Sequence, residues 1–276
     1  MFKADLHCHS TCSDGSLTPS ELIQRAKKMG LGGLSITDHD TINAYETAIV
    51  AAKEHGIRLG SGIELSCDFK ALHIHILGYD FDLSSPILHQ VCERHKERRL
   101  HRNREILSKL QNKGMKVTEE ELMQKTKGKS VGRPHIAALL VEKGYVKSIR
   151  QAFEKWIGEE KPCYAPGEPF PIEEGIDAIH KAGGKAFLAH PHLAEMVYPK
   201  PIPWDAIFNL PFDGIECFYG NFPPTSAQRW IEIAEKKHWL CSGGSDFHGD
   251  AKPDMELGSS VVDEETFDKI FTRLLA

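Results

Sequence analysis

Short apolar segments of the β-strand type alternate with helical segments along this chain, and no other feature restricts its fold as strongly. The opening segment, 2–9, precedes a helix expected at about 19–29, because Thr18, Pro19 and Glu21 form a helix-start pattern. Further strand patterns lie at 31–39, 57–66, 72–80, 185–191, 213–219 and 239–247. The alternation predicts an α/β fold with about seven strands of the parallel type.

The strand pattern is interrupted between Asp80 and Lys185, where about a hundred residues have a mostly helical pattern rich in Lys and Arg. An ordinary connection between neighbouring strands is far shorter. We therefore expect a main domain made of 1–84 and 169–276, with an inserted helical subdomain at 85–168.

Side chains of the metal-binding type stand where nearly all the expected strands end. In strand order they are His7 with His9, Asp38 with His39 and Asp40, Glu64, His190, and Asp246 with His248. Two more, His75 and Glu216, lie within their strands. An isolated histidine is commonly a core or surface group, but repetition at equivalent positions indicates a shared site. In α/β barrels that site lies at the carboxyl ends of the strands.

The residue types indicate the kind of ion. His7 and His9 point to the same face of a strand, because side chains alternate, whereas Cys8 points away. Imidazole and carboxylate together suit divalent ions of the Mn, Fe or Zn kind, and a carboxylate such as Glu64 or Asp246 can bridge two of them. The ligands exceed one coordination sphere, so we expect two or three ions.

Composition excludes several classes of protein. The chain is 41% hydrophobic and 26% charged, as globular proteins are, and no stretch approaches the ~18 apolar residues of a membrane span. Seven scattered cysteines without CxxC spacing predict reduced thiols. The net charge of -5 argues against a general nucleic-acid coat. We expect a cytoplasmic protein with no membrane association and no obligate protein partner.

The motifs resemble those of the polymerase and histidinol phosphatase (PHP) family of metal-dependent phosphoesterases over nearly the whole chain. The matching segments are 5–10, 13–15, 36–40, 62–64, 75–79, 189–191 and 244–248. The resemblance implies a distorted (β/α)7 TIM-like barrel with three bound ions. By resemblance, the first ion is held by His7, His9, Glu64 and Asp246, the second by Glu64, His75 and His190, and the third by Asp14, His39 and His248.

The inserted segment narrows the resemblance. Its Gly132-Arg133-Pro134-His135 motif resembles the branch of nucleoside 3′,5′-bisphosphate phosphatases and short-RNA 5′–3′ exonucleases, where the Arg and His face the phosphate. Asp14 stands where the histidinol phosphatase branch has a histidine, which argues against that branch. His192, two residues after His190, either reaches the substrate or has a structural role.

A basic segment lies in the same insertion. Residues 93–116 contain nine Lys or Arg residues against three Glu, and such charge can steer an anionic substrate. We interpret most of this charge as the solvated face of an amphipathic helix at 92–110 whose apolar side chains turn to the main domain. Those apolar side chains are Leu100, Ile106, Leu107 and Leu110.

We expect hydrolysis of phosphate esters by a metal-bridging hydroxide, with Mn²⁺ as the first choice of ion and Fe²⁺ or Zn²⁺ as alternatives. The expected substrate is a nucleoside 3′,5′-bisphosphate or a mononucleotide, and the 5′ end of short RNA is the alternative. An alternative from another functional class is a catalytically silent domain that binds metal or a nucleotide. Asp14, His39, Glu64, Asp246 and His248 are the expected catalytic residues, and Arg133, His135 and His192 the expected substrate-binding ones.

Overall fold

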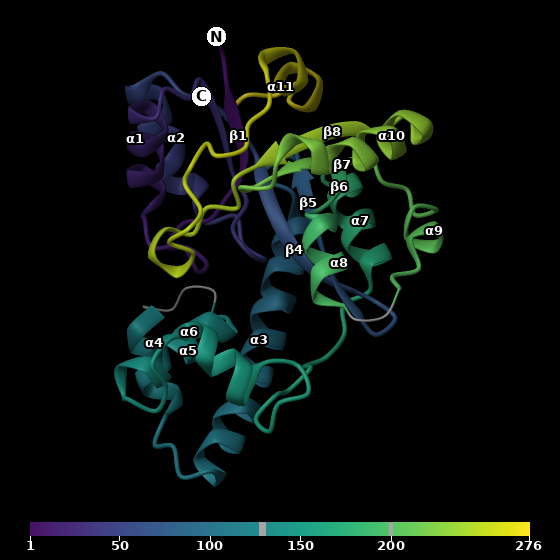
Figure 1. Cartoon of the computed structure of the whole chain (residues 1–276). Helices are drawn as coiled ribbons and strands as arrows, with labels where there is room; N and C mark the ends of the chain where they lie inside the picture. The colour runs from purple at the N-terminus through teal and green to yellow at the C-terminus, as the bar shows by residue number, and fades with distance from the viewer. Residues whose placement is uncertain (127–130, 199–200) are drawn as a thin grey trace. The chain divides into compact units, whose positions relative to one another are not determined.

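The computed structural model describes residues 1–126, 131–198 and 201–276, which form two compact units (Figure 1). The larger unit contains Met1–Val91 and Phe170–Ala276, and the smaller, helical unit contains Cys92–Pro169. The long helix α3 (Pro86–Asn112) runs through the first boundary, so its first turns belong to the larger unit. No described helix is both long and apolar enough to cross a lipid bilayer.

The described strands of the larger unit form two sheets. The first sheet is parallel, with the order β1-β2-β3, and contains β1 (Ala4–Cys8), β2 (Gly33–Ile36) and β3 (Arg58–Gly60). The second sheet has the order β4-β5-β6-β7-β8 and contains β4 (Gly62–Phe69), β5 (Leu72–Tyr79), β6 (Lys185–Leu188), β7 (Gly214–Tyr219) and β8 (Leu240–Gly244).

Helices cover the outer faces of these sheets (Figure 1). Beside the first sheet, α1 (Pro19–Lys28) packs on α2 (Tyr45–His55). The second sheet is accompanied by α7 (Ile172–Lys181), α8 (Pro191–Val197), α9 (Trp204–Ile207), α10 (Gln228–Lys237) and α11 (Glu264–Ile270). The start predicted for α1 is confirmed: Thr18 Oγ1 accepts from the Glu21 amide, and the Glu21 carboxylate accepts from the Thr18 amide.

The expectation that all strands run parallel is wrong for β5, which is antiparallel to both β4 and β6. A tight turn joins β4 to β5, and Lys70 occupies its left-handed position at φ 57°. The single strand expected at 57–66 is two strands, β3 and β4, separated at Ser61, whose hydroxyl donates to the Phe81 carbonyl.

Backbone hydrogen bonds connect the two sheets at two places, and each place lies beside ligand-type side chains. Between β1 and the end of β8, the Asp246 amide donates to the His7 carbonyl at 2.7 Å, and the His9 amide donates to the Phe247 carbonyl at 2.8 Å. Between the end of β2 and β4, the Asp40 amide donates to the Glu64 carbonyl at 2.8 Å. These bonds bring the ends of strands from both sheets to one region of the larger unit.

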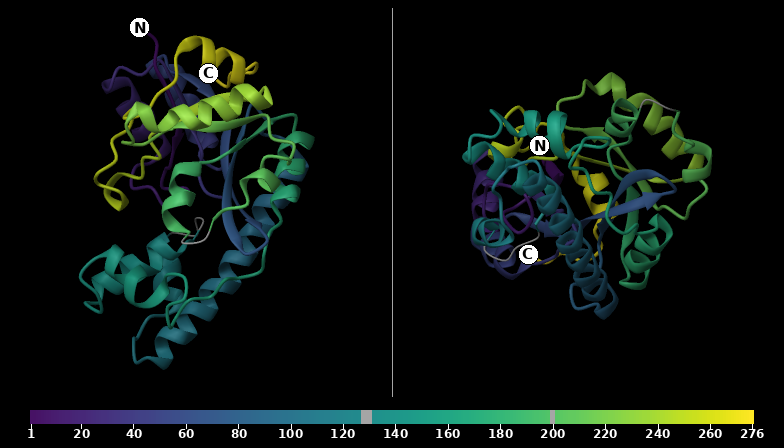
Figure 2. Two further views of the ribbon diagram at one scale, coloured as in Figure 1. Left: turned by 45° about the vertical axis from the view of Figure 1, so that its right-hand side comes forward. Right: turned by 90° about the horizontal axis from the view of Figure 1, so that it is seen from below.

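The helical unit has an apolar core of its own. Besides most of α3 it contains α4 (Glu119–Thr126), α5 (Arg133–Glu142), α6 (Ile149–Ala152) and a short π-helical segment, Phe153–Ile157 (Figure 2). Ile106, Leu107 and Leu110 of α3 are buried in this core together with residues such as Ile136 and Leu140 of α5. The expectation that these α3 side chains turn to the main domain is therefore wrong, because the insertion buries them itself.

One buried hydroxyl links β2 and β3 of the first sheet and provides a test of the fold. The single hydroxyl proton of Tyr45 on α2 is shared between the carbonyl oxygens of Ile36 and Gly60, which lie 2.8 and 3.1 Å from Oη. We expect Tyr45→Phe to lower the free energy of unfolding by about 1–3 kcal/mol, because these buried carbonyls lose a donor. Urea denaturation measures the effect.

Tyr145→Phe is the matched control for this prediction, because it removes a hydroxyl from a side chain that is 37% exposed. Water replaces the lost contact there, so we expect a change within about 0.5 kcal/mol. Equal effects of the two substitutions would contradict the role given to Tyr45.

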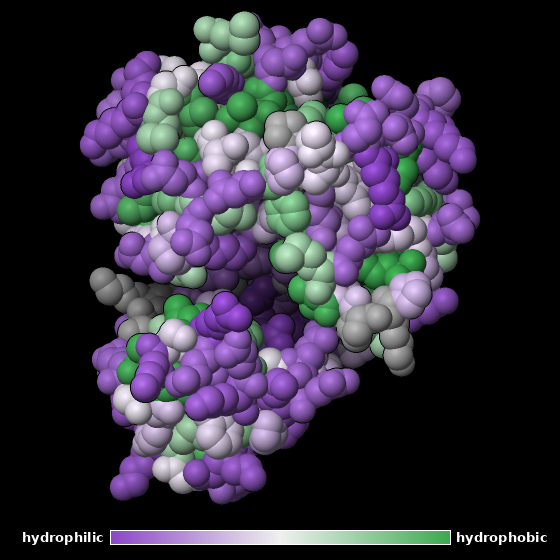
Figure 3. Space-filling model, viewed as in Figure 1, coloured by the Kyte–Doolittle hydropathy of each residue, from purple (hydrophilic) through white to green (hydrophobic). Residues whose placement is uncertain are grey.

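The face shown in Figure 3 is largely hydrophilic with scattered apolar side chains, as expected from the few exposed large hydrophobic residues.

Candidate metal centre

Four side chains, from the end of β1, the first half of β4 and the loop after β8, converge on one point. The Nε2 atoms of His7 and His9 lie 3.2 Å apart. His7 Nε2 lies 3.5 Å from both Glu64 Oε2 and Asp246 Oδ1. His9 Nε2 lies 3.2 Å from the same two oxygens. Ligand atoms about 2.0–2.2 Å from a shared ion stand roughly 3–3.4 Å from one another. This first group therefore has the spacing of a coordination sphere.

Hydrogen bonds favour one tautomer in two of the histidines when their rings are neutral. His7 Nδ1 lies 2.8 Å from the Glu216 carboxylate, which accepts its proton, so the lone pair of neutral His7 lies on Nε2. His248 Nδ1 donates in the same way to the Asp246 carbonyl at 2.9 Å, which leaves its Nε2 for Asp14. In the neutral form, both rings therefore offer Nε2 as a possible metal ligand.

Glu64 links the first group to a second one. Its Oε1 lies 2.8 Å from both His75 Nδ1 and His190 Nε2, and its Oε2 lies 3.0 Å from His39 Nδ1. Glu64 is 1% exposed, yet Oε2 and His39 Nδ1 have no hydrogen-bond partner in the described part of the chain. Buried polar atoms left without a partner are costly. A divalent ion between them would satisfy both.

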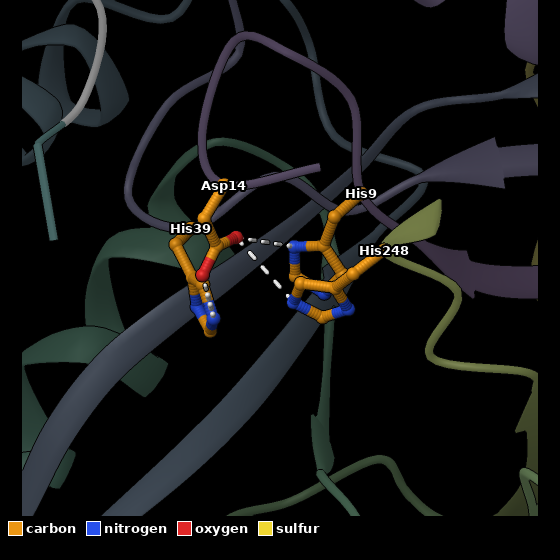
Figure 4. A group of neighbouring side chains, drawn as sticks. All are labelled: His9, Asp14, His39 and His248. Atoms are coloured by element: carbon orange, nitrogen blue, oxygen red, sulfur yellow. Dashed lines mark ion pairs between the residues drawn. The ribbon is translucent and has the colours of Figure 1, made fainter. Parts of the chain in front are cut away.

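The third group surrounds Asp14 (Figure 4). Asp14 Oδ1 lies 3.4 Å from His248 Nε2 and 3.8 Å from His9 Nδ1, and Asp14 Oδ2 lies 3.9 Å from His39 Nε2. These distances are longer than those of the first group. His39 faces Glu64 with one ring nitrogen and Asp14 with the other, so the structure brings it to both groups.

The electrostatics of the centre keep its carboxylates charged. Burial would raise the pKa of the Asp14, Glu64 and Asp246 carboxyls, but the surrounding histidines and, beside Asp246, Lys252 hold it well below the usual range. Ionised carboxylates are the form that binds metal.

The histidines differ among themselves. Burial would lower the pKa of His9, but Asp246 and Glu64 outweigh it and raise the pKa to about 9. Burial dominates at His39 and lowers its pKa to about 3. His39 is therefore neutral at pH 7 and offers a lone pair, whereas metal-free His9 carries a proton.

Further side chains hold these ligands in place. Glu216 accepts from His7 and, at 2.7 Å, from the His190 amide. Asp246 Oδ2 accepts from Tyr219 Oη and from Lys252 Nζ, both at 2.6 Å, which leaves Oδ1 to face the histidines. Sequence reasoning noted Glu216 within a strand but gave it no role, and Tyr219 and Lys252 were missed. The sequence feature that could have identified Glu216 is a charged residue inside the apolar strand 213–219. No sequence feature distinguishes Lys252 from other loop lysines.

Asp38 and Asp40 flank His39 in the sequence, and Asp38 bonds to serines of the loop after β1. Its carboxylate accepts from the Ser10 amide and hydroxyl and from the Ser13 hydroxyl, so it orders the loop that carries Asp14. It reaches an imidazole only through Ser13, whose hydroxyl lies 3.5 Å from His9 Nδ1. Asp40 accepts from the Ser66 amide at 2.7 Å.

The expected substrate-binding residues lie in different places. His192, at the start of α8, is 6% exposed and packs against Tyr219, Phe222 and Trp230, and neither of its ring nitrogens has a hydrogen-bond partner among the described residues. Arg133 and His135 begin α5 in the helical unit.

There the Arg133 guanidinium lies over the rings of Phe153 and Tyr164, and His135 Nδ1 accepts from the Gly132 amide at 3.1 Å. These contacts lie within the helical unit, so a role of Arg133 or His135 in substrate binding stays a prediction.

Known proteins are similar to this chain over most of its length. The family model described as PHP domain matches residues 5–160. The chain is 40% identical over 253 residues to a 5′-3′ exoribonuclease of Haemophilus influenzae, covering 89% of this chain and 90% of that protein.

Two further relatives extend the comparison. The chain is 30% identical to a 3′,5′-nucleoside bisphosphate phosphatase of Chromobacterium violaceum, covering 94% of this chain and 91% of that protein. A solved structure from Bifidobacterium adolescentis, assigned as a metal-dependent phosphoesterase, superposes with a TM-score of 0.88 at 30% identity, covering 97% of this chain and 94% of that one.

Proposed function

The chain belongs to the PHP domain family of metal-dependent phosphoesterases, and on this premise we propose that its centre hydrolyses phosphate esters of nucleotides with two or three bound divalent ions. One observation carries the proposal: the ligand atoms of His7, His9, Glu64 and Asp246 converge at 3.2–3.5 Å. The buried Glu64 Oε2, which lacks a hydrogen-bond partner among the described residues, supports it further.

Each group of the centre has a distinct part in this proposal. His7, His9, Glu64 and Asp246 hold the first ion, His75 and His190 share Glu64 with the second, and Asp14 and His248 serve the third, with His39 between the last two. When bound, such ions neutralise phosphoryl oxygens and lower the pKa of water, and Mn²⁺ is our first choice. The carboxylates stay ionised, and Glu216 keeps His7 in the tautomer that binds through Nε2.

We also propose that the two sheets form a single distorted (β/α)7 barrel of the TIM type. Its support is the pair of junctions at which β8 meets β1 and β4 meets the end of β2. A closed barrel brings the carboxyl ends of parallel strands to one mouth, where the ligand-type side chains of both sheets meet.

For the substrate we propose a nucleoside 3′,5′-bisphosphate or a mononucleotide. The second candidate is short RNA shortened from its 5′ end, and the 40% identity to an exoribonuclease favours it. In either case we infer that Arg133 and His135 contact a phosphate, while His192 has a structural role next to Tyr219 and Trp230.

Phosphate release by Mn²⁺-loaded protein tests the proposal. We would compare adenosine 3′,5′-bisphosphate, AMP, histidinol phosphate and a 5′-phosphorylated RNA ladder. Turnover of the bisphosphate with little effect on oligomers is the expected result. Stepwise shortening of the ladder would instead establish the exonuclease. Inactivity on every substrate at full metal loading would overturn the proposal and favour a silent binding domain.

Metal binding to the metal-free protein should release protons at neutral pH. His9 has a pKa raised to about 9, so it is protonated at pH 7 and must lose that proton to coordinate an ion. His39, with its pKa lowered to about 3, is already neutral and contributes nothing. Calorimetry of Mn²⁺ binding in buffers of different ionisation enthalpy counts the protons released.

The release should fall as the pH rises through about 9, because His9 is then neutral before the ion arrives. His9→Gln should release about one proton fewer at pH 7. Binding heats that do not depend on the buffer at pH 7 would contradict the protonation given to His9.

A further inference from the structure

A lysine lies at the metal centre, and neither the sequence motifs nor the ligand set accounts for it. Lys252 follows Asp246 and His248 in the loop after β8, just past the short helix Gly249–Ala251. Its Nζ lies 2.6 Å from Asp246 Oδ2. The Lys252 side chain is 39% exposed, whereas that of Asp246 is 3% exposed, so the lysine extends from solvent to the buried cluster.

Lys252 brings a positive charge to the carboxylates of the cluster. A lysine ammonium group is cationic across the neutral range, because its ordinary pKa is about 10.4. Among the described Lys and Arg side chains of the larger unit, it is the one that contacts a carboxylate of the ligand set.

Holding Asp246 does not require this lysine. The buried Tyr219 hydroxyl donates to the same oxygen, Asp246 Oδ2, at the same 2.6 Å, and orients the carboxylate without a charge. An ammonium group has three protons to donate, and Asp246 accepts one. Among the described residues no other acceptor lies within hydrogen-bond distance of Lys252 Nζ. Two donors on a partly exposed cation remain for an acceptor from outside.

We propose that Lys252 binds the phosphate group of the substrate, donating its two remaining N–H bonds to phosphoryl oxygens while it stays paired with Asp246. This inference rests on the proposed phosphoesterase function. It assigns a phosphate-binding cation to the larger unit itself, beside the ligand carboxylates. Charge-assisted hydrogen bonds of this kind are about twice as strong as neutral ones.

Binding of inorganic phosphate to the Mn²⁺-loaded protein tests the proposal without relying on turnover. We expect Lys252→Met to weaken phosphate binding by about tenfold or more, to raise KM for a nucleotide by a similar factor, and to leave the Mn²⁺ content unchanged. Lys252→Arg should restore most of the affinity because it keeps the charge. Lys269→Met, which removes a lysine paired with Glu265 on α11, is the matched control and should change nothing.

Two results would overturn the proposal. Phosphate affinity that is unchanged in Lys252→Met would show that the lysine does not contact phosphate. Loss of Mn²⁺ together with phosphate binding would make Lys252 a positioning residue for Asp246; Lys252→Gln repeats this comparison if the methionine variant does not fold. If the wild type hydrolyses none of the nucleotides but binds phosphate through Lys252, the proposed function fails and this inference stands.

Discussion

Replacing Glu64 by glutamine should lower kcat/KM by about 1,000-fold or more and reduce the bound metal, even at high Mn²⁺. Glu64 is the carboxylate on which two groups of the centre depend: its Oε2 belongs with His7 and His9, and its Oε1 with His75 and His190. Glutamine has nearly the same shape but no charge, and only one of its two terminal atoms accepts. It therefore cannot serve both groups.

Steady-state kinetics and metal analysis on the same preparation check this prediction. Glu46→Gln on the exposed face of α2 is the matched control, because it removes one exposed carboxylate charge from a helix that carries no ligand and should leave both readouts unchanged. Circular dichroism would show whether Glu64→Gln still folds. A variant with normal metal content and normal turnover would exclude Glu64 from the centre.

Glu216→Gln should weaken Mn²⁺ binding by about 10- to 100-fold while leaving the ligand set intact. Glu216 accepts at both oxygens, from His7 Nδ1 and from the His190 amide. A glutamine amide can accept at only one of these places, and its NH₂ group then faces a donor at the other. If the NH₂ group faces His7, the ring changes tautomer and places its proton on Nε2, where the ion would bind.

The loss caused by Glu216→Gln should be reversible with excess metal, unlike the loss caused by Glu64→Gln. Saturating Mn²⁺ should restore much of the activity of Glu216→Gln, because the ligands themselves are still present, whereas Glu64→Gln should not recover. Competition against a metal chelator measures the affinity, and Glu232→Gln on the exposed side of α10 is the control. Unchanged affinity would mean that the contact between Glu216 and His7 does not set the tautomer.

The sequence predicted where ligand-type side chains would lie better than it predicted how the strands run. Most expected ligands lie at or shortly after the carboxyl end of a strand, a position that periodicity and turn signals identify. Glu64 and His75 lie inside β4 and β5 instead, and Asp14 lies in the loop after β1. Strand direction has no such signal. The turn between β4 and β5 places Lys70 in the left-handed region, where glycine or asparagine would have indicated a hairpin, so the antiparallel β5 was taken for a parallel strand.

The features that the sequence did not predict depend on contacts between distant parts of the chain. Leu107 and Leu110 have the spacing of a buried helix face, but the spacing does not say whether the main domain or the insertion covers that face. Lys252 looks like any loop lysine until the chain places it beside Asp246. Tyr219 looks like an ordinary strand aromatic for the same reason.

The two junctions between the sheets also determine when the centre can form during synthesis of the chain. Six of the nine ligand-type side chains precede the helical unit, and His190, Asp246 and His248 follow it. Between His75 and Asp246 a ribosome adds about 170 residues, which takes roughly 10–30 s at typical rates. Throughout that interval the nascent chain holds an incomplete set of ligand-type side chains. Contacts between β1 and β8 bring Asp246 to this set, so we expect the complete set to form only after β8 has been synthesised.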